Sequence, residues 1–276
     1  MSRLVTQQHL PGDSRSNRLG RGIEFSEVKT YQPGDDVRSI DWRAWARSGQ
    51  TYSRLFTEER ERQMHVLVDQ RASMFFGSRS QFKSVLAAKL AAATIWASLD
   101  DGFRISGQIS AETELRTKAR STRSAAMDLI TSTARQNCAL SVQSKTSRSL
   151  TDMLSYTLAN TPTGSYVTLI SDFHDLKTDT IKLLTSICQH RKTQLLLIFD
   201  PVEKLLPLNL DIGISDGSER QRVHIDSLLQ EQQLQLFESR VHTLKKIALT
   251  TGAVLSLAST DHADQRQDHN PGDQHG

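Results

Sequence analysis

The chain has 276 residues, 37% of them hydrophobic, which is enough for one large domain with its own core and a smaller appendage. Its 34 basic and 31 acidic residues leave a formal charge of +3, a balance too even to indicate a nucleic-acid or membrane-surface binder. Two cysteines exclude a disulfide framework and favour a reducing compartment. The longest apolar stretch, 85–99, is too short to cross a bilayer, and the start lacks a signal-peptide core, so we expect a cytoplasmic protein without a membrane segment.

The first 63 residues are expected to form an arm and a small subdomain. Residues 1–20 are polar and rich in Ser, Arg and Asn, so they predict a flexible arm. Over 21–63 the apolar residues are scattered among arginines and acids, a pattern that favours short strands and loops. We therefore predict a β-rich subdomain here, with Trp42 and Trp45 as packing anchors.

Strand and helix patterns alternate between residues 64 and 260. Apolar runs predict strands over 64–69, 103–109, 166–170, 194–199 and 253–258. Helical spacing predicts helices from 82 to the stop at 101–102, over 121–136 and 149–160, near 179–190, and from the cap at Asp226 through Leu249. In the last helix, Leu229, Leu236, Phe237, Leu244 and Ile247 are candidate buried positions.

This alternation predicts the α/β class, with a doubly wound and mainly parallel sheet over 64–260, because parallel neighbours are usually joined by a crossover helix. A hairpin is expected near 212–225, where Asp216-Gly217 suits a tight turn. The tail, 261–276, is nearly devoid of apolar residues and is expected to be disordered.

Two predicted strands end in a carboxylate followed by a polar loop. One loop reads Asp69-Gln70-Arg71-Ala72-Ser73 and the other Ser171-Asp172-Phe173-His174-Asp175. Sites in doubly wound sheets form beyond the carboxyl ends of the strands, and oxygen ligands in such loops suit Mg²⁺. The alternative is that each aspartate caps the turn or helix that follows it.

The first loop resembles the start of the metal-ion-dependent adhesion site of von Willebrand factor A domains, whose motif is Asp-x-Ser-x-Ser. In this resemblance Asp172 corresponds to the later aspartate of the site and Thr151 to its threonine. The implied metal ligands are Asp69, Ser73, Thr151 and Asp172.

Arg71 stands where that family has its first serine, and a guanidinium cannot ligate a metal. It would instead neutralise Asp69 and Asp172. We therefore expect no cofactor, or at most weakly bound Mg²⁺, and a salt-bridged surface that contacts a partner protein. The residues expected on that surface are Arg71, Ser73, Asp172, His174, Arg43 and Arg47.

The amino-terminal subdomain carries the more specific resemblance. Gly20-Arg21-Gly22-Ile23-Glu24-Phe25 precedes Tyr31-Gln32-Pro33-Gly34-Asp35-Asp36-Val37-Arg38-Ser39-Ile40-Asp41-Trp42 and Ala46-Arg47, and together they resemble the signature of the DUF58 family. With the von Willebrand-like core, the resemblance covers most of residues 20–260. It implies an interaction or assembly protein that works with a MoxR-type AAA+ ATPase, and with other von Willebrand factor A-type proteins.

The charged residues of this signature have two interpretations. In the first, Asp35, Asp36 and Asp41 pair with neighbouring arginines in a structural knot. In the second, Arg43 and Arg47 accept an acidic segment of a partner. Loss of partner capture on charge reversal would distinguish them.

The familiar enzyme signatures are absent from the sequence, and we assign no catalytic residue. His174 is the one acid-base candidate, in a polar loop where histidines are usually solvated. The leading prediction is a non-enzymatic adaptor. The alternatives are a divalent-metal-dependent hydrolase or metal-dependent ligand-binding domain at Asp69 and Asp172, and an anion or nucleic-acid binder using arginines 38, 43, 47 and 54, which the interspersed acids disfavour.

Overall fold

The computed structural model describes residues 24–32, 37, 40–57, 62–144, 148–215 and 220–261. The chain divides into two compact units, Met1–Arg60 and Glu61–Gly276, each of which is described by itself. The arm expected at 1–20 lies outside the described residues, as does the expected tail beyond Asp261.

The described residues of the amino-terminal unit include a two-stranded antiparallel sheet and an α-helix. Strand β1 (Glu24–Thr30) pairs with β2 (Tyr52–Thr57), and α1 (Trp42–Ser48) lies between them in the chain. The helix was not expected. Its start is marked by Asp41, whose Oδ1 accepts the backbone N–H of Arg43 at 3.1 Å.

The two tryptophans of α1 are exposed. Trp42 is 59% exposed and Trp45 49%, and their rings meet edge to face with centroids 6.3 Å apart. Within the amino-terminal unit they therefore do not anchor a buried core, because each indole contacts the other and leaves about half of its surface exposed.

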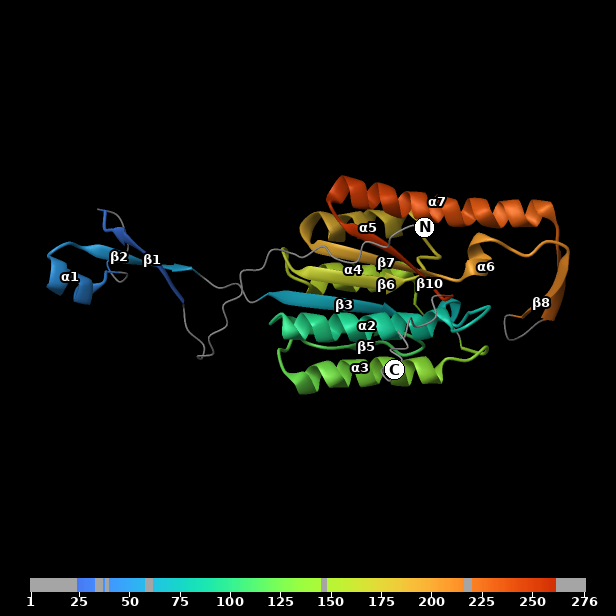
Figure 1. Cartoon of the computed structure of the whole chain (residues 1–276), viewed down its shortest axis with the longest axis horizontal. Helices are drawn as coiled ribbons and strands as arrows, with labels where there is room; N and C mark the ends of the chain where they lie inside the picture. The colour runs from blue at the N-terminus through green and yellow to red at the C-terminus, as the bar shows by residue number, and fades with distance from the viewer. Residues whose placement is uncertain are drawn as a thin grey trace, which may run out of the picture. The chain divides into compact units, whose positions relative to one another are not determined.

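The larger unit is organised by a six-stranded sheet with the order β10-β7-β6-β3-β4-β5 (Figure 1). All its strands run parallel except β5, which pairs antiparallel with β4, so the predicted doubly wound, mainly parallel sheet is confirmed. The strands are β3 (Gln63–Asp69), β4 (Arg104–Ser110), β5 (Leu115–Arg116), β6 (Tyr166–Ser171), β7 (Lys192–Phe199) and β10 (Val254–Ser259).

Helices cover both faces of the sheet (Figure 1). One face packs against α4 (Leu150–Asn160), α5 (Thr178–His190) and α7 (Ser227–Thr251), and the other against α2 (Lys83–Asp100) and α3 (Arg123–Ala139). Successive residues of β3 enter opposite cores, Leu67 the first and Val66 and Val68 the second. This burial on both faces explains why the central strands read as continuous apolar runs.

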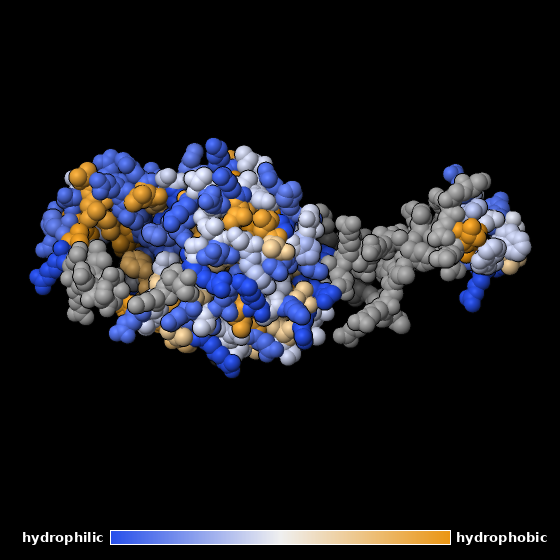
Figure 2. All heavy atoms as spheres, turned by 180° about the vertical axis from the view of Figure 1, so that it is seen from behind, coloured by the Kyte–Doolittle hydropathy of each residue, from blue (hydrophilic) through white to orange (hydrophobic). Residues whose placement is uncertain are grey.

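Smaller elements complete the larger unit. A 3-10 turn, η2 (Ala72–Met74), follows β3, and a short helix, α6 (Pro201–Lys204), follows β7. Strands β8 (Leu210–Ser215) and β9 (Arg220–Ile225) form an antiparallel hairpin whose turn, 216–219, lies outside the described residues. On the face of the larger unit shown in Figure 2, most exposed side chains are hydrophilic, and apolar side chains gather at the end where the hairpin and the start of α7 lie.

Helix α7 begins directly after the cap that the sequence predicts and ends close to its predicted end. The Asp226 side chain accepts the N–H of Leu229, and Gly252 ends the helix with φ 77°. Phe237, Leu244 and Ile247 are buried as expected, but Leu236 is 66% exposed. No helix in the described part of the chain is long and apolar enough to cross a membrane.

Candidate functional site

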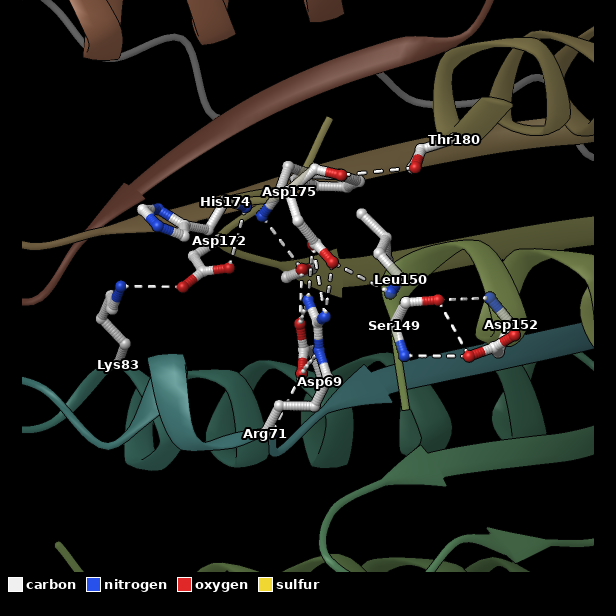
Figure 3. Close-up of polar contacts among 12 residues, drawn as sticks. Asp69, Arg71, Lys83, Ser149, Leu150, Asp152, Asp172, His174, Asp175 and Thr180 are labelled. Carbon is white, nitrogen blue, oxygen red and sulfur yellow. Dashed lines mark hydrogen bonds and ion pairs between the residues drawn. The ribbon is translucent and has the colours of Figure 1, made fainter. Parts of the chain in front are cut away.

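The carboxyl edge of the sheet, where β3 and β6 end side by side, holds a buried ion pair between Asp69 and Arg71. The Arg71 guanidinium donates from Nε to Oδ1 of Asp69 at 3.0 Å and from Nη2 to Oδ2 at 2.8 Å (Figure 3). Ser171 Oγ also donates to Asp69 Oδ2, at 2.7 Å. Asp69 is fully buried and Arg71 is 5% exposed, so the pair is desolvated and bidentate.

The same guanidinium reaches a second carboxylate, Asp175, in the loop after β6. Arg71 Nη1 lies 3.1 Å from Asp175 Oδ2, which also accepts the backbone N–H of Leu150 at 3.2 Å. Leu150 is the first residue of α4, so Asp175 lies at the positive end of that helix. Arg71 therefore joins the loops after β3 and β6, and Asp175 joins them to α4.

Asp172 has a different partner from the one expected. Arg71 was predicted to neutralise it, but Lys83, the first residue of α2, donates from Nζ to Asp172 Oδ2 at 2.9 Å. Figure 3 shows Lys83 directed at Asp172, whereas the guanidinium lies between Asp69 and Asp175. Arg71 makes its hydrogen bonds to Asp69 and Asp175, and it acts on Asp172 through its nearby charge alone, which also lowers the pKa of that carboxyl.

Two further charged residues extend this second pair. Lys83 Nζ lies 2.7 Å from Glu203 Oε1, and Arg240 of α7 donates from Nη2 to Glu203 Oε2 at 3.0 Å. Arg240 Nη1 also donates to the backbone carbonyl of Asp172 at 2.8 Å. Seven charged residues are linked by these ion pairs, and we call them the ion network: Asp69, Arg71, Lys83, Asp172, Asp175, Glu203 and Arg240.

The network shifts the pKa values of four of its members. Burial would raise the pKa of Asp172, but the charge and hydrogen bond of Lys83 outweigh it and lower the pKa to about 2. Burial likewise opposes the charge of Lys83 and Arg71, yet the neighbouring carboxylates raise both pKa values above their ordinary levels. The pKa of Asp175 is lowered because its hydrogen bond with Arg71 outweighs its burial. These four groups stay ionised around neutral pH.

The turn that holds Asp172 is strained. Phe173, fully buried, has φ 47°, a left-handed conformation that costs a non-glycine residue about 1 kcal/mol. Its N–H donates to Ser171 Oγ at 3.0 Å, and the N–H of His174 donates to Asp172 Oδ1 at 3.1 Å. The turn therefore orients two oxygen acceptors inward and leaves the His174 side chain exposed.

The residues proposed as metal ligands do not fit a divalent cation. Asp69 and Asp172 are each bound by a side-chain cation, and Thr151 Oγ1 lies 2.7 Å from the hydroxyl of Thr180. Ser73 is half-buried in the turn after β3. A metal among these groups would lie beside a guanidinium and an ammonium, which repel it.

Two of the six residues expected on a partner surface are buried. Arg71 and Asp172 are buried in the ion network, so they cannot contact a partner in this conformation, which corrects the prediction. His174 is exposed at the rim of the network and Ser73 is half-buried. Arg43 and Arg47 are exposed on α1, in the other unit.

A third strand-end carboxylate, Asp200 after β7, was missed as a site residue. It is fully buried and accepts the N–H of Ser78 at 2.9 Å, the hydroxyl of Thr260 at 2.6 Å and the N–H of Val202 at 3.1 Å. The last bond caps α6, the role that the sequence pattern Asp-Pro favours. Lys83, Glu203 and Arg240 were also missed, because nothing local in the sequence marks them as partners of Asp172.

Comparisons with known proteins find curated relatives that share part of the sequence. Two curated relatives, Uncharacterized protein Rv1480 of Mycobacterium tuberculosis (strain ATCC 25618 / H37Rv) and Uncharacterized protein Mb1516 of Mycobacterium bovis, are 35% identical over 111 residues. The match covers 39% of this chain and 35% of each relative, so this chain spans about a third of their length.

Solved structures that the chain resembles have low sequence identity to it. They are conserved hypothetical protein BatB from Bacteroides thetaiotaomicron (TM-score 0.45, 10% identity, 72% of this chain and 90% of that one) and an aerotolerance-related membrane protein from Bacteroides fragilis NCTC 9343 (0.40, 12%, 72% and 92%). A third is a von Willebrand factor type A protein from Catenulispora acidiphila (0.37, 13%, 54% and 35%). The family model described as Protein of unknown function DUF58 matches residues 27–246, and the chain therefore belongs to the DUF58 family.

Proposed function

We propose that this chain is a non-enzymatic interaction and assembly protein, an adaptor for a MoxR-type AAA+ ATPase in the maturation or regulation of another complex. One observation carries the proposal. The carboxyl edge of the sheet, where doubly wound domains hold their ligands, is occupied by ion pairs between the chain's own side chains.

The charge states of the network argue against proton-transfer catalysis. A general acid or base works best with a pKa near the operating pH. Instead, the pKa values of Asp172 and Asp175 are lowered and those of Lys83 and Arg71 are raised. All four shifts move away from neutrality, which suits a structural role.

The same residues make a metal cofactor unnecessary. Arg71 and Lys83 place positive charge beside Asp69 and Asp172, the charge that a divalent cation would supply. We therefore propose a domain that holds its carboxyl edge together without Mg²⁺ and binds its partners by direct contact.

Helix α1 is the surface that we propose for partner binding. Its exposed side chains include Trp42, Trp45, Arg43 and Arg47. Tryptophan and arginine are enriched among the residues that dominate binding energy at protein interfaces. The arginines make the surface complementary to an acidic segment, which we assign to the ATPase or to another von Willebrand factor A-type protein rather than to nucleic acid.

We place this interaction in the cytoplasm. Cys138 and Cys188 are free thiols, as suits a reducing compartment. We further propose that the affinity of this chain for the ATPase depends on the nucleotide that the ATPase holds.

The test measures binding of the full chain to a purified MoxR-type ATPase, with a non-hydrolysable ATP analogue and with ADP. Charge reversal of both arginines, Arg43→Glu with Arg47→Glu, is expected to weaken the nucleotide-dependent binding at least about tenfold. The matched control is Arg135→Glu with Lys245→Glu, which changes the net charge equally at exposed positions of α3 and α7.

The control pair is expected to bind like the unaltered chain. Absence of binding in both nucleotide states contradicts the adaptor proposal. Equal weakening by the two double variants contradicts the role of α1, because it would reflect net charge alone.

A further inference from the structure

Among the described residues, strand β10 forms one edge of the six-stranded sheet and pairs only with β7. An edge strand presents unpaired N–H and C=O groups along its outer side, and these can pair with another strand. Two apolar side chains of β10 are also exposed, Val254 at 58% and Leu257 at 45%.

The two edges of this sheet differ in how they are protected. The opposite edge strand, β5, has two residues, and its Arg116 forms an ion pair with Glu114 immediately before the strand. Short length and charge are the usual protections of an edge. Strand β10 has six residues, contains no charged residue or proline, and pairs with β7 without a register shift.

The packing contacts of β10 show on which face of the sheet each of its side chains lies. Leu255 packs with the core under α4, α5 and α7, and Ala258 packs with the core under α2 and α3. Because side chains alternate along a strand, Leu257 shares the face of Leu255, and Val254 shares the face of Ala258.

We propose that β10 pairs antiparallel with β10 of a second copy of this chain, about a twofold axis through Ser256. Directly opposite residues of an antiparallel pair lie on the same face, so the axis must pass through a residue pair rather than between two pairs. In this register Leu255 lies opposite Leu257 of the partner subunit, and Val254 lies opposite Ala258 of the partner subunit. The two copies of Ser256 face each other.

The sequence of the strand is the reason to choose a second copy as the occupant. Val254-Leu255-Ser256-Leu257-Ala258 has the same polarity pattern in both directions, so twofold pairing places apolar residues opposite apolar residues and serine opposite serine. No like charges meet, because the strand carries none. Pairing buries the exposed parts of Val254 and Leu257 and joins two sheets into one.

The mass of the full chain in solution tests the dimer. One copy has a mass of 30.9 kDa, and light scattering after gel filtration at about 100 μM, a concentration at which even weak pairs form, is expected to give twice that value. Leu257→Lys is expected to give the monomer mass, since it places a charge on the edge and removes an apolar pair. The control Leu249→Lys, at an 86% exposed position of α7, is expected to remain a dimer.

Cross-linking tests the register, in a Cys138→Ser background that removes the exposed native thiol. Ser256→Cys is expected to form an intermolecular disulfide on mild oxidation, because facing residues lie within disulfide range. Leu257→Cys is expected not to do so, since its copies are diagonal neighbours. A monomeric unaltered chain, a dimer that survives Leu257→Lys, or cross-linking through position 257 in place of 256 overturns the proposal.

Discussion

The two units of the chain each contain an aspartate followed two residues later by an arginine, and the two arginines have opposite environments. In both places the aspartate accepts the arginine's backbone N–H, Asp69 from Arg71 at 3.0 Å and Asp41 from Arg43 at 3.1 Å. Arg71 then turns its guanidinium onto the buried Asp69, whereas Arg43 is exposed on α1.

The difference shows what the short pattern determines. It determines the local turn, because an aspartate can accept a backbone N–H two residues on in either setting. It does not determine the place of the arginine side chain, which depends on whether other elements desolvate it. In the larger unit Asp175 and the start of α4 complete that environment.

The largest expected effect comes from breaking the buried pair. Arg71→Met leaves Asp69 buried with its charge uncompensated and is expected to lower the free energy of unfolding by about 3–5 kcal/mol. Arg43→Met, the same substitution in the exposed setting, is expected to change it by less than about 0.5 kcal/mol. Urea denaturation measures both, and equal losses would contradict the contrast between the two arginines.

Removing both charges separates pairing from packing. The double variant Asp69→Asn with Arg71→Met is expected to be more stable than Arg71→Met alone, because it removes the fully buried Asp69 charge that the single variant leaves unpaired, although the half-buried Asp175 loses its cation in both variants. A double variant as unstable as the single one would show that the guanidinium acts through packing and not through its charge.

The next effect is a dependence of stability on acid pH. The folded pKa of Asp172 is about 2, below its ordinary value of 3.8, so its contribution is complete above about pH 4 and is lost as the pH falls through the folded pKa. We expect the free energy of unfolding to fall by on the order of 2 kcal/mol between pH 4.5 and pH 2 from this group. The contribution of Asp172 is isolated by urea denaturation of the unaltered chain and of the double variant Asp172→Asn with Lys83→Met across that pH range. An equal fall of the free energy of unfolding with pH in the two proteins would contradict the assignment.

A small effect on stability is also expected at the exposed aromatic pair of α1. Trp42→Ala is expected to lower the free energy of unfolding by less than about 1 kcal/mol, compared with about 3–5 kcal/mol for a buried tryptophan. Thermal unfolding checks this value. A loss in the buried range would restore the packing role that the sequence favours.

Most of the fold could be predicted from the sequence because the central strands are buried on both faces. The apolar runs at 64–69, 166–170 and 194–199 lie within β3, β6 and β7, with ends displaced by no more than two residues. Helix α1 could not be predicted in the same way. It has seven residues, and Trp42 and Trp45 are exposed, so no buried stripe marks it.

The candidate site also has a part that local sequence predicts and a part that it does not. The predicted strand ends identified Asp69 and Asp172 as candidate site residues. The place of Arg71 in the loop directly after Asp69 predicted that these two side chains pair. The pairing of Asp172 with Lys83 joins residues 89 positions apart. Glu203 and Arg240 join the network from α6 and α7, so only the packing of the helices on the sheet brings these groups together.

Calorimetric titration of the full chain with Mn²⁺ and Mg²⁺ tests the central claim most directly, that side-chain cations hold the carboxyl edge together in place of a metal. We expect no heat of binding below millimolar concentrations, because Arg71 and Lys83 already neutralise Asp69 and Asp172. A micromolar binding isotherm that Asp69→Ala abolishes would contradict the claim.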